Sequence, residues 1–270
     1  MAEHPNILLK KTFVAIAGAS RGLGRSIALQ LSAKLPSNSV IVLMARNSRA
    51  LGSVKFEVMS VAPNIKVLVR YYDQGNLENT DYFKDIFNEL LLENEISEDD
   101  FEQYMIVHNC ATIGDVTKRS LELSDSTSVR KYFDINLTGM ILLNTSFFQT
   151  FMDSTKSRVV VNMTSAATSI PIASLHLYCA GKAARDMYIR VLAVEEPSMR
   201  ILTFAPGSAD TEMAKEVERF SMNKYFVGKI KELRANGKTK HPDTPIFKLV
   251  QILEENTFEN AVYVESDKIL

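Results

Sequence analysis

The sequence predicts an α/β fold, a doubly wound domain with a seven-stranded parallel sheet and helices on both faces. Three observations lead to this prediction. Short runs rich in valine, isoleucine and leucine alternate with stretches of helical periodicity along all 270 residues. The runs are continuously apolar rather than alternating, which is typical of strands covered on both faces. No internal repeat or linker interrupts the alternation, so we expect a single domain over residues 1–270.

The strands are expected at the apolar runs, and the helices where apolar residues recur at helical spacing. The predicted strands cover residues 12–18, 39–44, 66–72, 104–109, 158–164, 200–206 and 261–264. The predicted helices cover about 24–34, 48–61, 77–93, 128–152, 177–195 and 244–255. Residues 207–245 are charged and interrupted by Gly228 and Gly237, so a long irregular segment is expected there. A segment of that size is a lid or binding element, or a surface excursion with a short helix.

Charge and composition narrow the possible partners. The chain carries 31 basic and 32 acidic residues, which supplies no positive field for nucleic acid or an anionic membrane. No apolar run approaches the roughly 18 residues of a membrane span, and the polar start MAEHPNILLKK is unlike a secretory signal. A cytoplasmic location is therefore expected. Cys110 and Cys179 are too few for a disulfide framework and lack metal-ligand spacing, so we expect reduced thiols and no metal.

A glycine-rich turn, GASRGLGR, follows the first predicted strand. It places Gly18, Gly22 and Gly24 where a helix opens at about Leu23. Glycines there let the backbone approach a pyrophosphate, whose charge is met by the helix N-terminus. The spacing differs from GxGxxG, and a bare structural turn is the alternative. Its place between a strand and a helix favours a Rossmann-type dinucleotide site.

The end of the second predicted strand indicates which dinucleotide is bound. An acid at this point accepts a hydrogen bond from the ribose of NAD, whereas an arginine accommodates the 2′-phosphate of NADP. Residues 45–47 read Ala-Arg-Asn, with no acid. Arg46, together with Ser20 and Arg21, makes a cationic pocket suited to a phosphate, so NADP(H) is preferred. The alternative is that the arginines are solvated surface residues.

Tyr178 and Lys182 lie four positions apart in a predicted helix, on one face. A free tyrosine has a pKa of about 10, and a neighbouring ammonium lowers it by favouring the phenolate. Two ordinary surface residues are the alternative, because such pairs are common. Ser165, however, follows the fifth predicted strand, at the edge where open α/β sheets bind ligands. Its hydroxyl could hold a carbonyl oxygen while Tyr178 protonates it and a nicotinamide delivers hydride.

The motifs GASRGLG, DINLTG (134–139), YCAGK (178–182) and Pro206-Gly207, with Ser165 between them, occur in the order of the classical short-chain dehydrogenase/reductase family. The chain resembles that family over nearly its whole length. The resemblance implies a catalytic tetrad, with one member holding a water of the proton relay and another also binding the nicotinamide ribose. By this resemblance the tetrad consists of Asn136, Ser165, Tyr178 and Lys182. Asn136 would hold the water, and Lys182 would also bind the ribose. In the alternatives, Asn136 only bonds backbone in its helix and Ser165 is a turn residue.

Three longer stretches, 114–127, 178–188 and 191–213, are similar to pterin-reducing members of the family. This similarity implies that a homodimer uses NADPH to reduce the side-chain carbonyl of a pterin in the closing steps of tetrahydrobiopterin synthesis. It also implies an acidic pterin anchor, which falls at Glu265 where the relatives have aspartate. A carboxylate can accept two parallel N–H bonds from a pterin edge. A charged residue in a polar tail is the alternative for Glu265. The expected substrate contacts are Ser165, Tyr178, Gly207 and Glu265.

One motif departs from the family. The usual NNAG after the fourth strand is His-Asn-Cys-Ala at 108–111, which keeps only Asn109 and changes the packing next to the cofactor. We expect His108 to be buried and hydrogen-bonded, and Cys179 to pack. Two other functions stay open, namely reduction of another dicarbonyl or ketone, and a catalytically silent NADP-binding regulator. The expected cofactor contacts are Gly18, Ser20, Arg21, Gly22, Leu23, Gly24, Arg46, Asn47, Asp73, Asn109, Tyr178, Lys182, Pro206 and Gly207. Asp73 accepts from the adenine amino group or caps the helix expected near Leu77.

Overall fold

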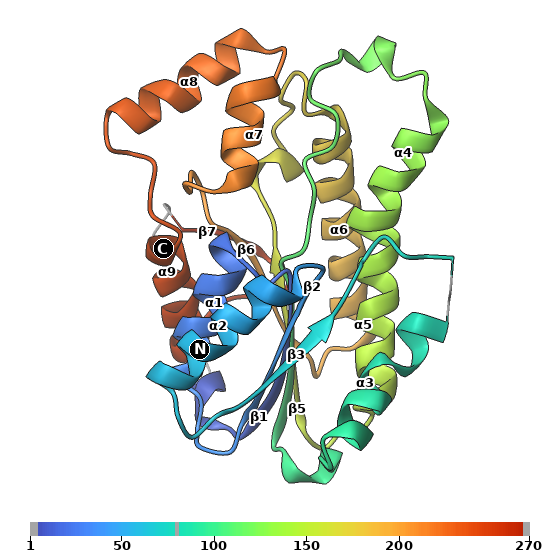
Figure 1. Cartoon of the computed structure of the whole chain (residues 1–270), viewed down its shortest axis with the longest axis vertical. Helices are drawn as coiled ribbons and strands as arrows, with labels where there is room; N and C mark the ends of the chain where they lie inside the picture. Colours follow the sequence, from blue (N-terminus) through green and yellow to red (C-terminus); the bar gives the residue numbers. More distant parts are fainter. Residues whose placement is uncertain (1–4, 79–80, 267–270) are drawn as a thin grey trace.

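A parallel sheet forms the centre of the molecule (Figure 1). The computed structural model describes residues 5–78 and 81–266, and within them the sheet has seven strands in the order β3-β2-β1-β4-β5-β6-β7. All neighbouring strands pair in parallel. The predicted fold class is therefore confirmed. The strands are β1 (Thr12–Ala17), β2 (Val40–Ala45), β3 (Lys66–Tyr71), β4 (Gln103–His108), β5 (Ser157–Met163), β6 (Arg200–Ala205) and β7 (Tyr263–Glu265).

Helices cover both faces of the sheet (Figure 1). Successive side chains of β1 enter opposite cores, with Val14 and Ile16 in one and Phe13 and Ala15 in the other. Because both faces are buried, the strands read as continuous apolar runs. None of the helices within residues 5–78 and 81–266 has the length and apolarity of a membrane span. One face is covered by α1 (Gly22–Ser32), α2 (Ser48–Val61) and α9 (Asp243–Glu255), the other by α3 (Asp81–Glu93), α5 (Gly139–Thr150) and α6 (His176–Glu195).

The helix predicted over 128–152 is two helices. The first, α4 (Ser126–Phe133), passes through a π-helical turn at Asp134–Thr138 into α5. A π turn holds one more residue than an α turn, and such turns often occur at functional sites. Asn136 lies inside this turn, so its side chain is set apart from the regular repeat of the helix.

The region predicted to be irregular, 207–245, contains α7 (Glu212–Phe220) and α8 (Lys224–Ala235) instead. Both lie above the carboxyl ends of the strands (Figure 1). The prediction of an irregular segment is wrong for these residues, because short helices with few buried apolar positions resemble charged loops. A side chain caps the N-terminus of each helix. Thr211 accepts a hydrogen bond from Ala214 N at the start of α7, and Asn223 accepts one from Phe226 N at the start of α8.

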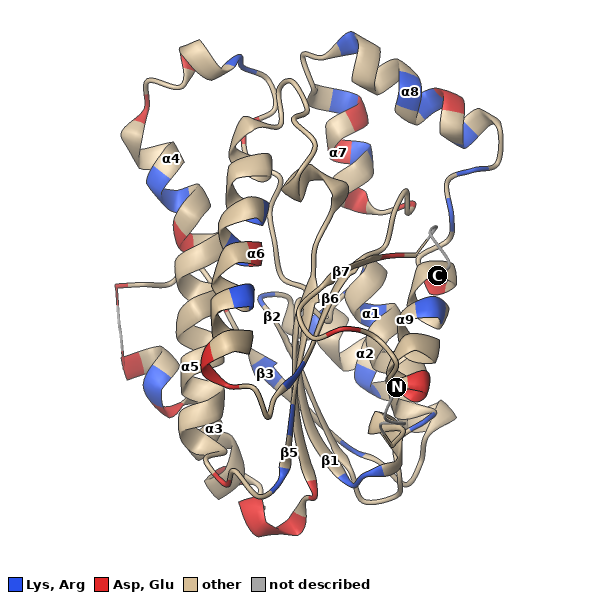
Figure 2. Ribbon diagram, turned by 180° about the vertical axis from the view of Figure 1, so that it is seen from behind, with Lys and Arg blue, Asp and Glu red and all other residues tan. Residues whose placement is uncertain are grey.

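Ion pairs hold these two helices. Arg234 of α8 pairs with Asp210 at 3.3 Å and with Glu218 of α7 at 3.1 Å. Figure 2 shows basic and acidic residues interspersed over α7 and α8. The charged residues that led to the prediction of an irregular segment therefore form tertiary contacts between the helices.

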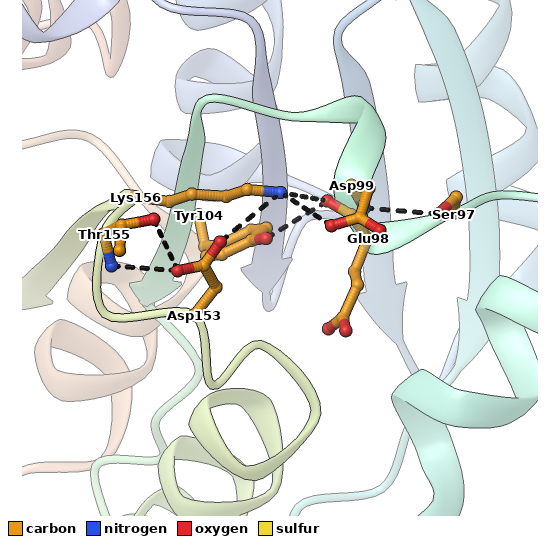
Figure 3. A network of polar contacts seen from close by, with 7 residues as sticks. All are labelled: Ser97, Glu98, Asp99, Tyr104, Asp153, Thr155 and Lys156. Atoms are coloured by element: carbon orange, nitrogen blue, oxygen red, sulfur yellow. Dashed lines mark hydrogen bonds and ion pairs between the residues drawn. The ribbon is translucent and has the colours of Figure 1, made fainter.

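A polar network around Lys156 lies at the opposite edge of the sheet (Figure 3). Its ammonium donates to Glu98 O at 3.1 Å and to the Asp99 carboxylate at 3.4 Å, and it lies 5.6 Å from the Tyr104 ring centroid. The Tyr104 hydroxyl donates to the same Glu98 carbonyl at 3.1 Å. These contacts tie the start of β4 to the residues before β5.

Candidate active site

A cavity of about 1410 Å³ lies at the carboxyl edge of the sheet. Parallel strands bring the residues that follow each of them to this edge, which is where open α/β sheets bind ligands. Most of the predicted site residues line it, namely Gly18, Ser20, Arg21, Gly22, Leu23, Arg46, Asn47, Asp73, Asn109, Tyr178, Lys182 and Pro206. Five predicted residues, all within the described chain, are not part of its lining: Gly24, Asn136, Ser165, Gly207 and Glu265.

The glycine turn is packed tightly against the end of β4. Gly18 has φ +80°, a left-handed conformation that favours glycine, and its carbonyl accepts a hydrogen bond from Asn109 Nδ2 at 3.0 Å. A Cβ on Gly24 would lie 2.0 Å from that same carbonyl oxygen. Arg21, the N-cap of α1, makes no side-chain capping bond, so the first N–H groups of the helix face the cavity uncapped by that residue. Such an N-terminus suits a pyrophosphate.

Two arginines line the cavity beside the turn. Within the described residues, neither the Arg21 nor the Arg46 side chain forms a hydrogen bond or an ion pair, although the charge of Arg21 acts on Glu212 of the same cavity. Asn47 also lines the cavity, and its side chain caps α2 by accepting from Ala50 N at 3.0 Å. Two such cations next to a helix N-terminus fit the phosphates of NADP(H).

Asp73 also lines the cavity, after β3. Its carboxylate accepts from Gly75 N at 3.0 Å, which closes a local turn. The predicted helix over 77–93 begins only at Asp81, and residues 79 and 80 lie outside the described chain. The helix-cap interpretation of Asp73 is therefore wrong, because the helix starts too far along the chain. The contact with adenine stays a prediction.

Tyr178 and Lys182 lie on one face of α6, and both line the cavity. The Lys182 ammonium is buried, donates to Met163 O at 2.7 Å and lies 5.6 Å from the centroid of the Tyr178 ring. Burial raises the pKa of the Tyr178 phenol, whereas its hydrogen bond with Ser165 and the charge of Arg185 lower it. Burial, followed by the charge of Arg185, lowers the pKa of Lys182 well below its usual range. The sequence predicts a lowered pKa for Tyr178, and this prediction is wrong: burial outweighs the lowering effects and leaves the pKa raised, while the buried Lys182 is itself easier to deprotonate.

Asn136 and Ser165 have structural contacts. Asn136 Oδ1 accepts from Thr112 N at 2.9 Å, and its Nδ2 donates to Tyr132 O at 2.9 Å. The side chain thus joins the π turn to the segment after β4. The hydrogen bond to backbone within its own helix, which was the alternative for Asn136, is also present. Ser165 follows β5 and accepts from Ala167 N at 3.2 Å, so it is a turn residue as well as a neighbour of the Tyr178 hydroxyl.

The C-terminal strand places Glu265 at the same edge of the sheet. Glu265 is part of β7, in register with Ala205 of β6, rather than in a polar tail. Burial, and after it the charge of Glu265, raises the pKa of Tyr263 to about 12. Gly207 follows β6 with φ +69° and turns the chain toward α7. Substrate contacts of Glu265 and Gly207 stay predictions.

Several residues at the site were missed by sequence reasoning. Gln74 donates to Ile135 O at 2.5 Å and lines the cavity together with Thr112, Thr211 and His241. Arg185 lies behind the cavity and is 1% exposed. Only its spacing from Lys182, one turn along the same helix face, pointed to its position. Nothing in that spacing signals a buried charge.

His108, the first residue of the altered family motif, is buried, as predicted. Its Nε2 is 3.1 Å from Asn144 Oδ1, and it is 1% exposed. Burial, and after it the charge of Arg185, lowers the pKa of His108 to about 3. The imidazole is therefore neutral in the folded protein at neutral pH.

We expect this histidine to make the protein less stable in mild acid. The unfolded chain binds a proton at His108 below its ordinary pKa of about 6.5, whereas the folded chain does not until about 3. The contribution of neutral His108 to stability is thus fully present above pH 6.5. Below that pH, the free energy of unfolding falls by up to about 1.4 kcal/mol per pH unit. Urea unfolding across this range should show a shallower fall for His108→Gln than for wild type. Equal slopes would contradict the assignment.

Known proteins are similar to this chain over most of its length. Residues 12–221 match the family model of short chain dehydrogenase. Sepiapterin reductase of Rattus norvegicus is 35% identical over 251 residues, 93% of this chain and 94% of the relative. Benzil reductase of Bacillus subtilis is 29% identical over 92% of this chain and 96% of the relative. The crystal structure of a Shigella flexneri short chain dehydrogenase complexed with NADP superposes with a TM-score of 0.77 at 18% identity, covering 97% of this chain and all of that one.

Proposed function

Since the chain belongs to the short-chain dehydrogenase family, we propose that it reduces the side-chain carbonyl of a pterin, sepiapterin or 6-pyruvoyl-tetrahydropterin, in tetrahydrobiopterin biosynthesis. It is an oxidoreductase of carbonyl or CH–OH groups that uses NADP(H). The observation that carries the substrate proposal is the likeness to sepiapterin reductases over 93% of the chain. The proposal includes the homodimer that the family resemblance implies, the cytoplasmic location and the single domain expected from the sequence.

The lining residues divide into a part for the cofactor and a part for the reaction. Arg46 and Arg21 would hold the 2′-phosphate, and the N-terminus of α1 the pyrophosphate. Asp73 would meet the adenine and Lys182 the nicotinamide ribose. When bound, NADPH supplies the hydride.

Proton transfer falls to the chain itself. Tyr178 donates its phenolic proton to the carbonyl oxygen, which Ser165 holds in place by a hydrogen bond. Asn136 supports the relay that returns a proton to Tyr178. Its side chain fixes the backbone after β4 against the π turn, so that the relay has a rigid frame. The cavity adjoining Tyr178 receives the rest of the pterin.

We expect Glu265→Gln to raise the KM for sepiapterin by about tenfold or more, because charge-assisted bonds to a pterin contribute about 1.5–3 kcal/mol. Reduction of a small dicarbonyl such as diacetyl, which cannot reach the anchor, should be nearly unchanged. NADPH absorbance follows both reactions. Glu259→Gln, an exposed carboxylate of the same segment, is the matched control.

The same assay decides between the candidate functions. Rapid NADPH oxidation with sepiapterin supports the proposal, and equal losses on both substrates in Glu265→Gln would remove Glu265 as the anchor. The relationship to benzil reductase favours a second candidate, reduction of another diketone, which oxidation with benzil but not sepiapterin would establish. NADPH binding without oxidation of any carbonyl would indicate a silent NADP-binding regulator.

A further inference from the structure

A buried arginine lies directly behind the site. Arg185 is on the same face of α6 as Tyr178 and Lys182, one turn beyond the lysine, and it is 1% exposed. Its guanidinium points toward the carboxyl ends of β4 and β5, away from solvent. None of the steps proposed above uses it.

All hydrogen-bond partners of this guanidinium are neutral. It donates to His108 O at 2.9 Å, to Cys110 O at 3.1 Å and to Asn162 Oδ1 at 3.1 Å, while its Nε has no partner among the described residues. Within residues 5–78 and 81–266, no carboxylate forms an ion pair with it. A buried ion without a counter-ion is costly, and an apolar side chain would avoid that cost. The charge itself therefore calls for an explanation.

The guanidinium faces the groups that titrate at the site. Its positive charge lowers the pKa of Tyr178, Lys182 and His108. Burial makes the Lys182 amine easier to deprotonate, whereas an arginine keeps its charge at every pH a protein meets. Arg185 thus remains positive where Lys182 is the weaker cation. The other groups that interact with it are Cys110 after β4, Tyr132 of α4 and Tyr72 after β3. Cys110, in turn, interacts with Arg46 and Asp73.

We propose that Arg185 is a positioning residue of the active site, whose guanidinium joins the ends of β4 and β5 beneath the cavity and supplies a permanent positive charge behind Tyr178. The part that concerns proton donation rests on the proposed function. The hydrogen bonds hold Cys110 and Asn162, next to the cofactor and the catalytic serine segment, in fixed positions. The charge favours the phenolate that remains after Tyr178 gives up its proton.

Two substitutions separate the hydrogen bonds from the charge. Arg185→Gln removes the charge and keeps polar donors, whereas Arg185→Met removes both, and Arg190→Gln, at an exposed arginine of the same helix, is the matched control. In Arg185→Gln, the pH at which carbonyl reduction declines in base should rise by about one unit, because the phenol and the Lys182 amine both lose their protons at higher pH. In Arg185→Met, this limb should rise by the same amount while turnover falls about fivefold further, because the carbonyls are no longer held.

A second readout needs no turnover. Phenolate absorbance, taken as the difference between each enzyme and its Tyr178→Phe counterpart, reports the ionisation of Tyr178 alone. We expect it to move upward in Arg185→Gln and in Arg185→Met but not in Arg190→Gln, in the NADPH complex. If no carbonyl is reduced, the proposed function fails, yet this titration still tests Arg185. Unchanged ionisation in Arg185→Gln and Arg185→Met, or an equal shift in Arg190→Gln, overturns the proposal. Arg185→Met repeats the charge removal if Arg185→Gln does not fold.

Discussion

Tyr178→Phe is expected to lower kcat for carbonyl reduction by about a hundredfold or more, since it removes the proposed proton donor. The ring stays in place on α6, with Lys182 still at its face, so NADPH affinity should change little. A loss confined to kcat identifies an interaction made in the transition state. Stopped-flow measurement of NADPH oxidation, together with an NADPH titration by fluorescence, checks both parts.

Tyr132→Phe is the matched control. Tyr132 is a second buried phenol, 4% exposed, which packs against α6 at Gly181 and does not line the cavity. Burial raises its pKa, as it does for Tyr178, but none of the proposed steps uses its hydroxyl. We expect turnover near wild type in this variant. Normal turnover in Tyr178→Phe, or equal losses in the two variants, would contradict the mechanism.

The strands were predictable from sequence and parts of the helical layer were not. Strands buried on both faces leave an uninterrupted apolar signal, as in β1, β2 and β4, which the structure confirms. The π turn at Asp134–Thr138 changes the helical register by one residue, which is too little to disturb the periodicity of the whole segment. The helices α7 and α8 were not predicted because they are stabilised by ion pairs and N-caps and bury few apolar side chains.

The site was predictable where topology alone gathers residues. Because the strands are parallel, the glycine turn, Arg46 and Asp73 lie at one edge of the sheet, independently of their side-chain contacts. Electrostatics was not predictable, because the effect of Lys182 on the phenol depends on burial and on another cation that lies within the core. Arg185 looks like an ordinary helical arginine in sequence, and its burial and its neutral hydrogen-bond partners are seen only in the folded chain.

Gly24→Ala is expected to weaken NADPH binding by about tenfold to a hundredfold, although alanine is the better helix former. The new Cβ would lie 2.0 Å from Gly18 O and 2.7 Å from Asn109 Nδ2, so the glycine turn must move away from β4. Overpacking of this kind costs about 1–3 kcal/mol, whereas the gain in helix propensity is at most about 1 kcal/mol. The steric cost therefore exceeds the gain in helix propensity, and it distorts the glycine turn that shapes the phosphate site. An NADPH titration and urea unfolding measure the two effects separately.

Gly52→Ala provides the opposite case. Gly52 is inside α2, and its Cβ would meet nothing within 4 Å, so only the gain in propensity remains. We expect this variant to be more stable than wild type by up to about 1 kcal/mol, with unchanged NADPH affinity. If Gly24→Ala behaved like Gly52→Ala, the close approach of α1 to the end of β1 would not constrain the cofactor site. The loss of affinity in one variant and not in the other would trace NADPH binding to this backbone contact, since both exchanges add the same methyl group to a helix.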